Sequence, residues 1–263
     1  MCTVLVLRRV HPTLPLVLAA NRDEFYARPA RGPEVLLASP RTIGGRDEVR
    51  AGTWMGVTDA GLFVGLTNQR TSGPADATRR SRGEVVLRAL ESGSVDGVER
   101  LLDTLAPAEF NPFNLLYGDA ERLRVAYARP EGFTREDVPE GLHVLPNDRL
   151  DHAGIPKVTR ARALVGDVAG LGWEELCERL KGALADHALP PLESVEEPAQ
   201  GSRFTRELVR QLQALCIHTP AYGTRSSALV ALQPGRVAHY LATEGAPCVS
   251  PWVDVLPLVY PRG

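Results

Sequence analysis

The sequence has little lysine, few cysteines, no long apolar run and almost no net charge. Its 263 residues carry a formal net charge of −2. No broad basic field is therefore present to attract nucleic acid or an anionic membrane, and we expect no nucleic-acid partner. Lysine stands only at Lys157 and Lys181 among the 30 basic residues, so arginine supplies nearly all the positive charge.

The cysteines are too scattered to suggest a cross-linked or metal-bound framework. They form no CxxC pair and stand at Cys2, Cys177, Cys216 and Cys248. This spacing predicts neither a disulfide framework nor a zinc cluster, and we expect no metal and no cofactor.

The apolar runs at residues 3–7 and 15–20 are too short for a membrane span. No basic region precedes the first run, as it would in a signal peptide. We therefore expect a cytoplasmic protein with no integral membrane segment. With 44% hydrophobic and 24% charged residues, and with neither an internal repeat nor a domain boundary, residues 1–263 are expected to form one domain.

The most informative stretch is the first two dozen residues. The two apolar runs flank a turn that contains Pro12, which predicts a β-hairpin. The second run continues into Asn21-Arg22-Asp23-Glu24, so the hairpin would bring this polar cluster back to Cys2.

Cys2 has the position of an N-terminal nucleophile. A small second residue usually allows removal of Met1, which would leave Cys2 with a free α-amino group of reference pKa about 8. That amine can take the proton of the thiol, so that one residue supplies both nucleophile and base. The alternative is a cysteine that packs inertly in a strand.

Two asparagines stand at the ends of predicted strands. Asn68 ends a hairpin built around Asp59-Ala60-Gly61, and Asn147 follows a short strand at 142–145. A strand-terminal asparagine can offer its amide to a developing oxyanion, although it is also a common turn residue. The loop at 25–33 carries two arginines, Arg28 and Arg31, which would either bind an anion or form a solvated pocket rim.

The rest of the chain alternates helical and β-rich segments. Ser81 and Glu84 have the spacing of a capping box at a helix start. Further helices are predicted at 95–105, 157–168, 173–184 and 204–215, and further strands at 115–119, 123–127, 226–232 and 237–243. This order implies antiparallel sheets with helices outside them.

Several motifs, taken together, resemble the NRDE-domain family, also called the transport and Golgi organisation protein 2 family. They are the start Met1-Cys2, LAANRDEFYARP at 18–29, GTWMG at 52–56, LTN at 66–68 and YGTRSS at 222–227. The resemblance implies an α+β fold of the N-terminal nucleophile hydrolase type, a four-layer αββα sandwich of two antiparallel sheets. The most similar enzymes would be choloylglycine hydrolases and penicillin V acylases, which cleave linear amides.

By this resemblance, Cys2 is the nucleophile, Asp23 orients its amine, and Asn68 and Asn147 hold the oxyanion. An arginine of those enzymes aligns with Ala20, so Arg22 would have to replace it from the other face of the strand. Their later catalytic arginine would be Arg203 or Arg225. We expect substrate contacts from four residues: Asn21, Arg22, Trp54 and Arg225.

Two functions follow from these features. The first is an amidohydrolase or acyltransferase that uses Cys2 on a linear amide or acyl substrate. The second is a non-catalytic binding or trafficking protein for a haem-like or acyl-CoA-like ligand. Haem would need an axial ligand such as His218, His239 or Cys2. No spacing of histidine and cysteine favours haem, and the sequence favours core or surface positions for both histidines. The sequence predicts no oligomeric state.

Overall fold

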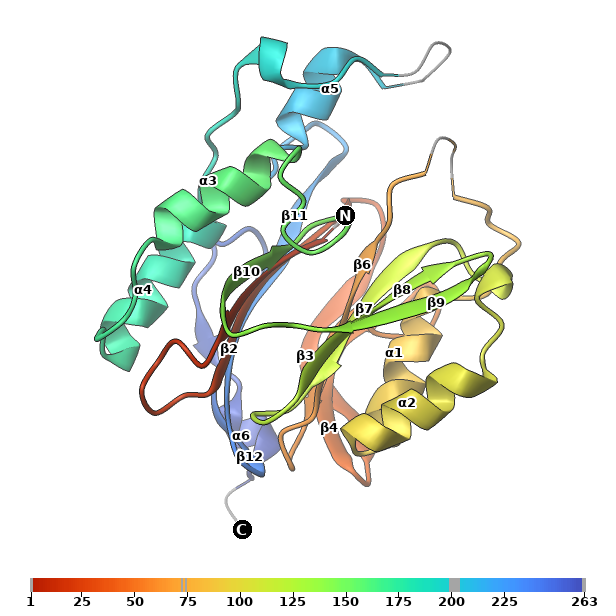
Figure 1. Cartoon of the computed structure of the whole chain (residues 1–263), viewed down its shortest axis with the longest axis vertical. Coiled ribbons are helices and arrows are strands. Elements are labelled where there is room, and N and C mark those ends of the chain that lie inside the picture. The colour runs from red at the N-terminus through yellow and green to blue at the C-terminus, as the bar shows by residue number, and fades with distance from the viewer. Residues whose placement is uncertain (1, 72, 74, 199–203, 262–263) are drawn as a thin grey trace.

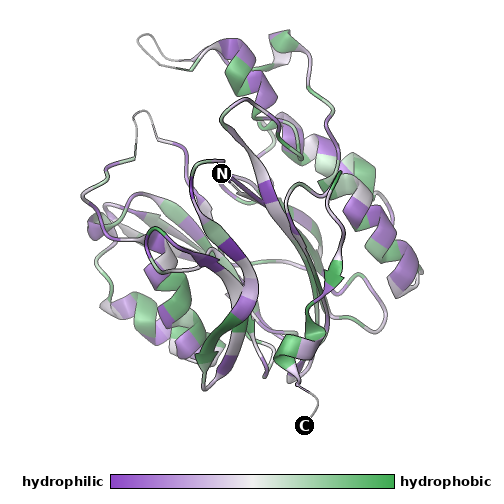
Figure 2. Cartoon of the chain, turned by 180° about the vertical axis from the view of Figure 1, so that it is seen from behind, coloured by the Kyte–Doolittle hydropathy of each residue, from purple (hydrophilic) through white to green (hydrophobic). Residues whose placement is uncertain are grey.

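Two antiparallel β-sheets face one another, and helices cover the outer face of each (Figure 1). The computed structural model describes residues 2–71, 73, 75–198 and 204–261, with Cys2 described by its backbone alone. The predicted α+β fold with two antiparallel sheets is confirmed. Figure 2 shows the same layers from behind, with hydrophilic residues spread along the outer helices.

The first sheet contains the N-terminal hairpin at its centre. Its strands, in spatial order, are β10 (Gly141–Leu145), β1 (Cys2–Arg8), β2 (Leu16–Phe25), β11 (Tyr222–Gln233), β12 (Arg236–Glu244) and β13 (Val253–Asp254). The register of β1 with β2 pairs Cys2 with Arg22 and Thr3 with Asn21. The predicted hairpin therefore forms, and it places the start of β1 beside the polar end of β2.

The second sheet follows the chain order almost as a meander. Its strands are β3 (Ala30–Ala38), β4 (Arg41–Asp47), β5 (Met55–Thr58), β6 (Phe63–Asn68), β7 (Phe113–Gly118), β8 (Leu123–Arg129) and β9 (Gly132–Asp137). The predicted hairpin between β5 and β6 turns at Gly61, whose φ of +84° favours glycine.

Each sheet has its own pair of helices. α1 (Arg82–Glu91) and α2 (Val95–Thr104) pack on the second sheet, and α3 (Pro156–Val165) and α4 (Trp173–Leu184) pack on the first. Gly56 lets α1 approach β5, since a Cβ there would lie 2.8 Å from the Leu90 side chain. The short helices are α5 (Arg206–Gln211), α6 (Leu256–Val259), η1 (Pro107–Glu109) and η2 (Leu192–Ser194).

Three apolar layers hold these elements together. Along β2, Leu16 and Leu18 belong to the core between the sheets, whereas Val17 and Ala19 belong to the core under α3 and α4. A third cluster lies between the second sheet and α1 and α2. Because both faces of β2 are covered, eight consecutive residues of this strand are buried.

Several local predictions were wrong. The helix predicted at 204–215 is only α5, because beyond it the backbone N–H of Cys216 bonds to Asp186 instead of continuing a helix. The capping box is not formed, because Ser81 makes no side-chain cap bond and Glu84 pairs with Arg80.

Strand occurs within the loop predicted at 25–33 and before the strand predicted at 226–232. β3 runs through Pro33, which is tolerated because β3 is an edge strand with bulges in its pairing to β4. β11 begins at Tyr222, because residues 222–224 pair with the end of β2 across another irregularity.

Candidate active site at the polar end of the N-terminal hairpin

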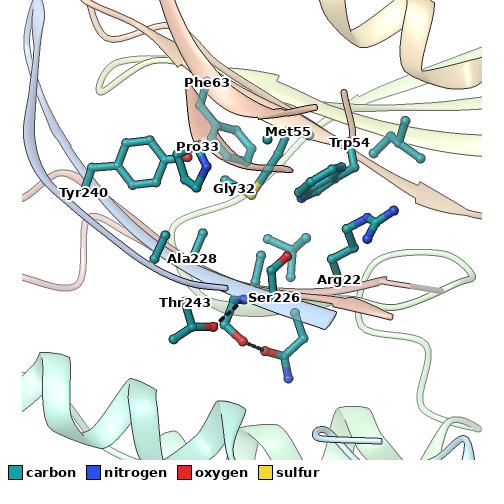
Figure 3. Close-up of a pocket in the computed structure, with 18 residues that line it drawn as sticks. Arg22, Gly32, Pro33, Trp54, Met55, Phe63, Ser226, Ala228, Tyr240 and Thr243 are labelled. Atoms are coloured by element: carbon teal, nitrogen blue, oxygen red, sulfur yellow. Dashed lines mark hydrogen bonds between the residues drawn. The ribbon is translucent and has the colours of Figure 1, made fainter. Parts of the chain in front are cut away.

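Arg22 and Trp54 meet between the two sheets. The Arg22 side chain, 6% exposed, extends from β2, and its guanidinium carbon lies 4.2 Å from the Trp54 ring centroid (Figure 3). Such a cation–π contact stabilises by about 1–2 kcal/mol when it is shielded from water. Gly45 makes room for the ring, since a Cβ at this position would lie 2.2 Å from the Trp54 carbons. Two of the four residues predicted to contact substrate, Arg22 and Trp54, therefore contact each other.

Two cavities adjoin this pair, and both are lined by Arg22, Trp54 and Leu66. The inner cavity is mostly apolar and has a volume of about 30 Å³, which is room for one or two water molecules. The outer cavity has a volume of about 300 Å³. Six arginines and four carboxylates line the outer cavity: Arg22, Arg28, Arg50, Arg79, Arg80 and Arg82, with Asp23, Glu24, Asp47 and Asp76. The excess of arginine favours an anionic ligand.

Asp23 lies at the edge of the outer cavity and is 1% exposed. The Thr224 hydroxyl donates a hydrogen bond to its Oδ1 at 2.6 Å. Burial raises the pKa of the Asp23 carboxyl above its usual value, and the positive charge of Lys157 on α3 opposes this effect. A buried carboxyl of raised pKa is a frequent feature of functional sites.

The strand register brings the start of the chain to the same place. Cys2 is paired with Arg22, next to Asp23 in β2. The Cys2 side chain and Met1 lie outside the described part of the structure, so the predicted contact between the thiol, its amine and Asp23 stays a prediction.

The two predicted oxyanion residues lie side by side. Asn68 ends β6 and lines the outer cavity. The Asn147 side chain, which is buried, donates a hydrogen bond from Nδ2 to the backbone carbonyl of Asn68 at 2.8 Å. Asn147 thus positions Asn68. Of the two residues, Asn68 lines the outer cavity and Asn147 does not.

Asn21 has a different environment from the one expected of a substrate contact. Its Nδ2 donates to the carbonyls of Leu184 and Leu215, both at 2.8 Å, and its Oδ1 accepts from the Ser227 hydroxyl at 2.5 Å. Neighbouring residues in a strand point to opposite faces, so Asn21 points toward the α4 layer while Arg22 points between the sheets. The Asn21 side chain joins β2 to that layer and has no group left for a substrate.

Arg225 also bonds to the protein itself. Its guanidinium donates to the carbonyls of Phe25, Tyr26 and Arg28, at 3.1, 2.8 and 3.3 Å. This arginine therefore shapes the loop after β2, whose Arg28 lines the outer cavity and pairs with Asp47. Arg203, the other candidate, lies outside the described residues.

The expectation that Arg22 works from the opposite strand face to Ala20 is wrong. Residues two apart in a strand share a face, and both Ala20 and Arg22 line the inner cavity. The side chains of Ala20 and Arg22 therefore lie on the same face of β2, and Arg22 is two residues closer to the end of the strand.

Lys157 and Thr224 were not among the residues predicted for the site. Lys157 is 2% exposed on α3, and Thr224 is 2% exposed on β11. Lysine is rare in this chain, so a lysine among apolar helix residues could have indicated a special role for Lys157. For Thr224 the only signal was its position inside the YGTRSS motif.

The histidines considered for haem lie away from these cavities. His239 stacks on Trp173 with ring centroids 4.1 Å apart. His218 lies beside Cys216 and Cys248. Among the described residues that line the outer cavity, none is a histidine or cysteine. Within the described residues, no helix is long and apolar enough to cross a membrane.

Comparison with known structures shows the same fold at low sequence identity. Two variants of conjugated bile acid hydrolase from Clostridium perfringens superpose with TM-scores of 0.59 and 0.52, each at 13% identity. The alignments cover 99% and 100% of this chain and 95% of each hydrolase. The fold is that of the N-terminal nucleophile hydrolases, as the resemblance implied.

Sequence comparison shows the family. The Transport and Golgi organization protein 2 homolog of Bos taurus is 31% identical over 234 residues, covering 82% of this chain and 81% of that protein. The human homolog is 27% identical over 233 residues, with the same coverage. The family model described as Transport and Golgi organisation 2 matches residues 1–243. This chain therefore belongs to the Transport and Golgi organisation 2 family.

Proposed function

We propose that the chain is an N-terminal cysteine amidohydrolase or acyltransferase that acts on a small linear amide or acyl substrate with an anionic group. The observation that carries the proposal is the register that pairs Cys2 with Arg22, at the edge of an arginine-rich cavity and next to buried Asp23. The hydrolase fold of the similar structures is consistent with it.

In the proposed reaction, removal of Met1 frees the α-amine of Cys2, and Asp23 orients this amine. The amine takes the thiol proton as sulfur attacks the substrate carbonyl carbon. The Asn68 amide, held by Asn147, donates to the oxyanion of the tetrahedral intermediate. The C–N bond then breaks, the leaving amine takes the proton, and a thioester remains. Water or another nucleophile attacks the thioester and releases the acyl group.

The charges around the outer cavity suggest what the substrate carries. Arg22 is the arginine shared by both cavities, so its guanidinium would lie near the scissile bond. Arg28, Arg50 and Arg79 line only the outer cavity, where Arg28 pairs with Asp47 and Arg79 with Asp76. A carboxylate or phosphate farther along the substrate would share these arginines with their present partners.

Activity on a panel of acyl amides with and without a terminal carboxylate tests the proposal. Each amide is offered to the wild type and to Cys2→Ala, and Cys177→Ser is the matched control because Cys177 is buried on α4, in the core between the helices and the first sheet. We expect turnover of carboxylate-bearing amides by the wild type and the control and none by Cys2→Ala. Equal turnover by Cys2→Ala would refute the mechanism.

A second candidate function is binding of an acyl-CoA-like ligand without turnover. An adjoining cavity of about 300 Å³ shares Asn68, Ala75, Arg82 and Asn111 with the arginine-rich one. Apolar side chains of Phe204, Val209 and Leu212 contribute to its lining. An anionic head and an apolar tail would fit the pair of cavities. Haem is a weaker candidate, because no described histidine or cysteine lines either cavity.

Thermal shift with palmitoyl-CoA, coenzyme A and haemin distinguishes these ligands. If the chain is a carrier, palmitoyl-CoA raises the Tm of both the wild type and Cys2→Ala, and Arg22→Gln weakens the shift. No shift with palmitoyl-CoA at 100 μM would argue against the second candidate.

A further inference from the structure

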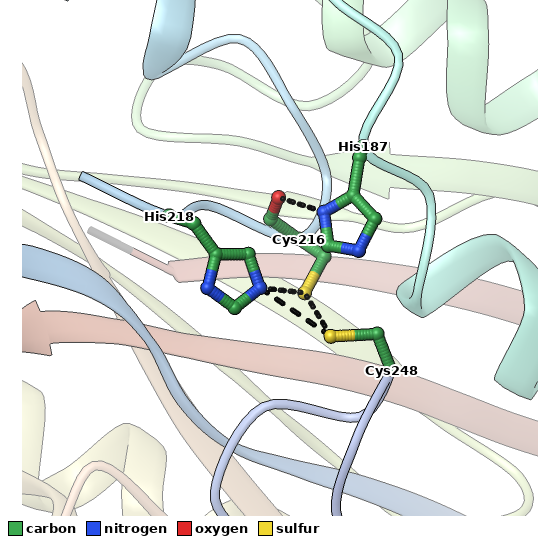
Figure 4. Close-up of side chains that lie close together, drawn as sticks. All are labelled: His187, Cys216, His218 and Cys248. Carbon is green, nitrogen blue, oxygen red and sulfur yellow. Dashed lines mark hydrogen bonds between the residues drawn. The ribbon is translucent and has the colours of Figure 1, made fainter.

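Four side chains from distant parts of the sequence meet near the end of α4. They are His187, Cys216, His218 and Cys248, and one ligand atom of each lies within 4.8 Å of the ligand atoms of the others. Figure 4 shows the two sulfur atoms and the two imidazoles turned toward one another. The spacing of the cysteines along the sequence predicted no zinc cluster. That spacing carries no information on which cysteines and histidines the fold brings together.

The three distances among the ligand atoms of Cys216, Cys248 and His218 match edges of a metal-binding tetrahedron. The Sγ atoms of Cys216 and Cys248 are 3.7 Å apart. The Nε2 atom of His218 is 3.5 Å from the Cys216 sulfur and 3.3 Å from the Cys248 sulfur. With Zn–S bonds of about 2.3 Å and Zn–N bonds of about 2.05 Å, a tetrahedral site has S···S edges of about 3.8 Å and S···N edges of about 3.6 Å.

His187 is oriented as a metal-binding histidine is. Its Nδ1 lies 3.2 Å from the backbone carbonyl of Cys216, and a proton on Nδ1 would be donated to that oxygen. Metal-bound histidines commonly fix one ring nitrogen in this way, which leaves the other nitrogen for the ion. The rings of His187 and His218 are 4.9 Å apart, so both can face one centre.

We propose that these four residues bind one Zn²⁺ ion in a closed tetrahedral S₂N₂ site. Two thiolates and two neutral imidazoles are a ligand set that selects zinc, and four protein ligands leave no open position for chemistry. Binding replaces two thiol protons, which are released to solvent, so the site with its ion is electrically neutral. Both histidines are exposed, which gives the ion a path to the otherwise buried Cys216.

The ion would join the segment after α4 to two loops that flank strands of the first sheet. His187 follows α4, Cys216 and His218 precede β11, and Cys248 lies between β12 and β13. Ile217, between two ligands, exchanges backbone and side-chain hydrogen bonds with Thr224, the residue whose hydroxyl bonds to Asp23. The zinc site would therefore hold in place Ile217 and Thr224, through which Asp23 is hydrogen-bonded. The proposed zinc site does not depend on whether Cys2 is catalytic.

Metal analysis of the full-length, tag-free chain tests the site directly. We expect one zinc per chain after purification without chelator. When the chain is stripped and reloaded with Co²⁺, we expect the intense visible bands of tetrahedral cobalt and a thiolate-to-cobalt charge-transfer band. His187→Ala and Cys248→Ser should each bind zinc at least about 100-fold more weakly, since even outer-shell partners contribute 10–100-fold.

His152→Ala and Cys177→Ser are the matched controls, because one is an exposed histidine and the other a buried cysteine outside the cluster. Both should bind zinc as the wild type does. Excess zinc at 100 times its Kd should raise the Tm of the stripped wild type by roughly 5–10 °C and leave His187→Ala unchanged. His187 is exposed, so its replacement should still give a folded chain.

Three results would overturn the proposal. One is substoichiometric zinc in the purified chain together with failure of the reduced, stripped chain to take up cobalt. Another is equal zinc affinity in His187→Ala and the wild type. The third is a Cys216–Cys248 disulfide in the isolated chain that, once reduced, still gives no metal binding.

Discussion

Replacing Asn21 with alanine should destabilise the fold rather than weaken substrate binding. The Asn21 amide is buried and makes hydrogen bonds to Leu184, Leu215 and Ser227. The substitution leaves two carbonyls and one hydroxyl without this partner. Each orphaned group costs about 1–3 kcal/mol, and partial access of water makes the total less than the sum, so we expect a loss of about 3–6 kcal/mol. That is a large part of the 5–15 kcal/mol typical of a domain.

Urea unfolding followed by circular dichroism measures this loss. In a chain of this size, 1 kcal/mol shifts Tm by about 2–4 °C, so Asn21→Ala should lower Tm by roughly 10–20 °C. Asn111→Ala is the matched control, because Asn111 is also hydrogen-bonded but lies in the partly exposed contact with Asp76. It should lose less than half as much. A loss below about 1 kcal/mol for Asn21→Ala, or a raised KM at unchanged stability, would refute this structural role.

Three further predictions concern the candidate site. Asn68→Ala should lower kcat about 10²–10³-fold with little change in KM, and a loss under tenfold would exclude Asn68 as an oxyanion donor. Arg22→Gln should raise KM for anionic substrates more than Arg225→Gln does, because Arg22 lines both cavities whereas Arg225 bonds to loop carbonyls; the reverse order in steady-state kinetics would contradict this assignment. Burial raises the folded-state pKa of Asp23 above its unfolded value of about 3.9, so its contribution to stability is present at low pH and is lost as pH rises through the folded-state pKa. The unfolding free energy of the wild type minus that of Asp23→Asn should therefore fall with rising pH, and a flat or rising difference would show that the pKa is not raised.

The N-terminal hairpin was predictable because its signals are local. Two apolar runs of strand length flank a turn with Pro12, and the register then brings Cys2 to Arg22. The meeting of Asn68 and Asn147 rested on the family resemblance, since the two residues are 79 positions apart.

The role of Asn21 could not be predicted from the pattern of the strand. In a strand with one exposed face, alternation tells which side chains point to the core. β2 is covered on both faces, so its residues are apolar on both sides and the pattern gives no direction for Asn21 or Arg22. The difference between the two residues comes from their neighbours: Asn21 bonds to Leu184 of α4 on one face, and Arg22 packs on Trp54 on the other.

Tertiary contacts, and not helix propensity, determine where α5 ends. Residues 212–215 belong to the helix predicted at 204–215 but lie beyond the end of α5, because Cys216 bonds to Asp186 and Ile217 bonds to Thr224. The same departure from helix brings Cys216 and His218 to His187 and Cys248, and a scan of cysteine spacing cannot detect such a cluster.

Covalent labelling of the purified chain with an acylating β-lactone, followed by intact-mass analysis and peptide mapping, shows whether Cys2 is the nucleophile. A nucleophilic thiol activated by its own amine should react ahead of Cys177, Cys216 and Cys248. We expect a chain that lacks Met1 and carries one adduct, on Cys2, and no adduct in Cys2→Ala. Retention of Met1 with no adduct on Cys2 would contradict it.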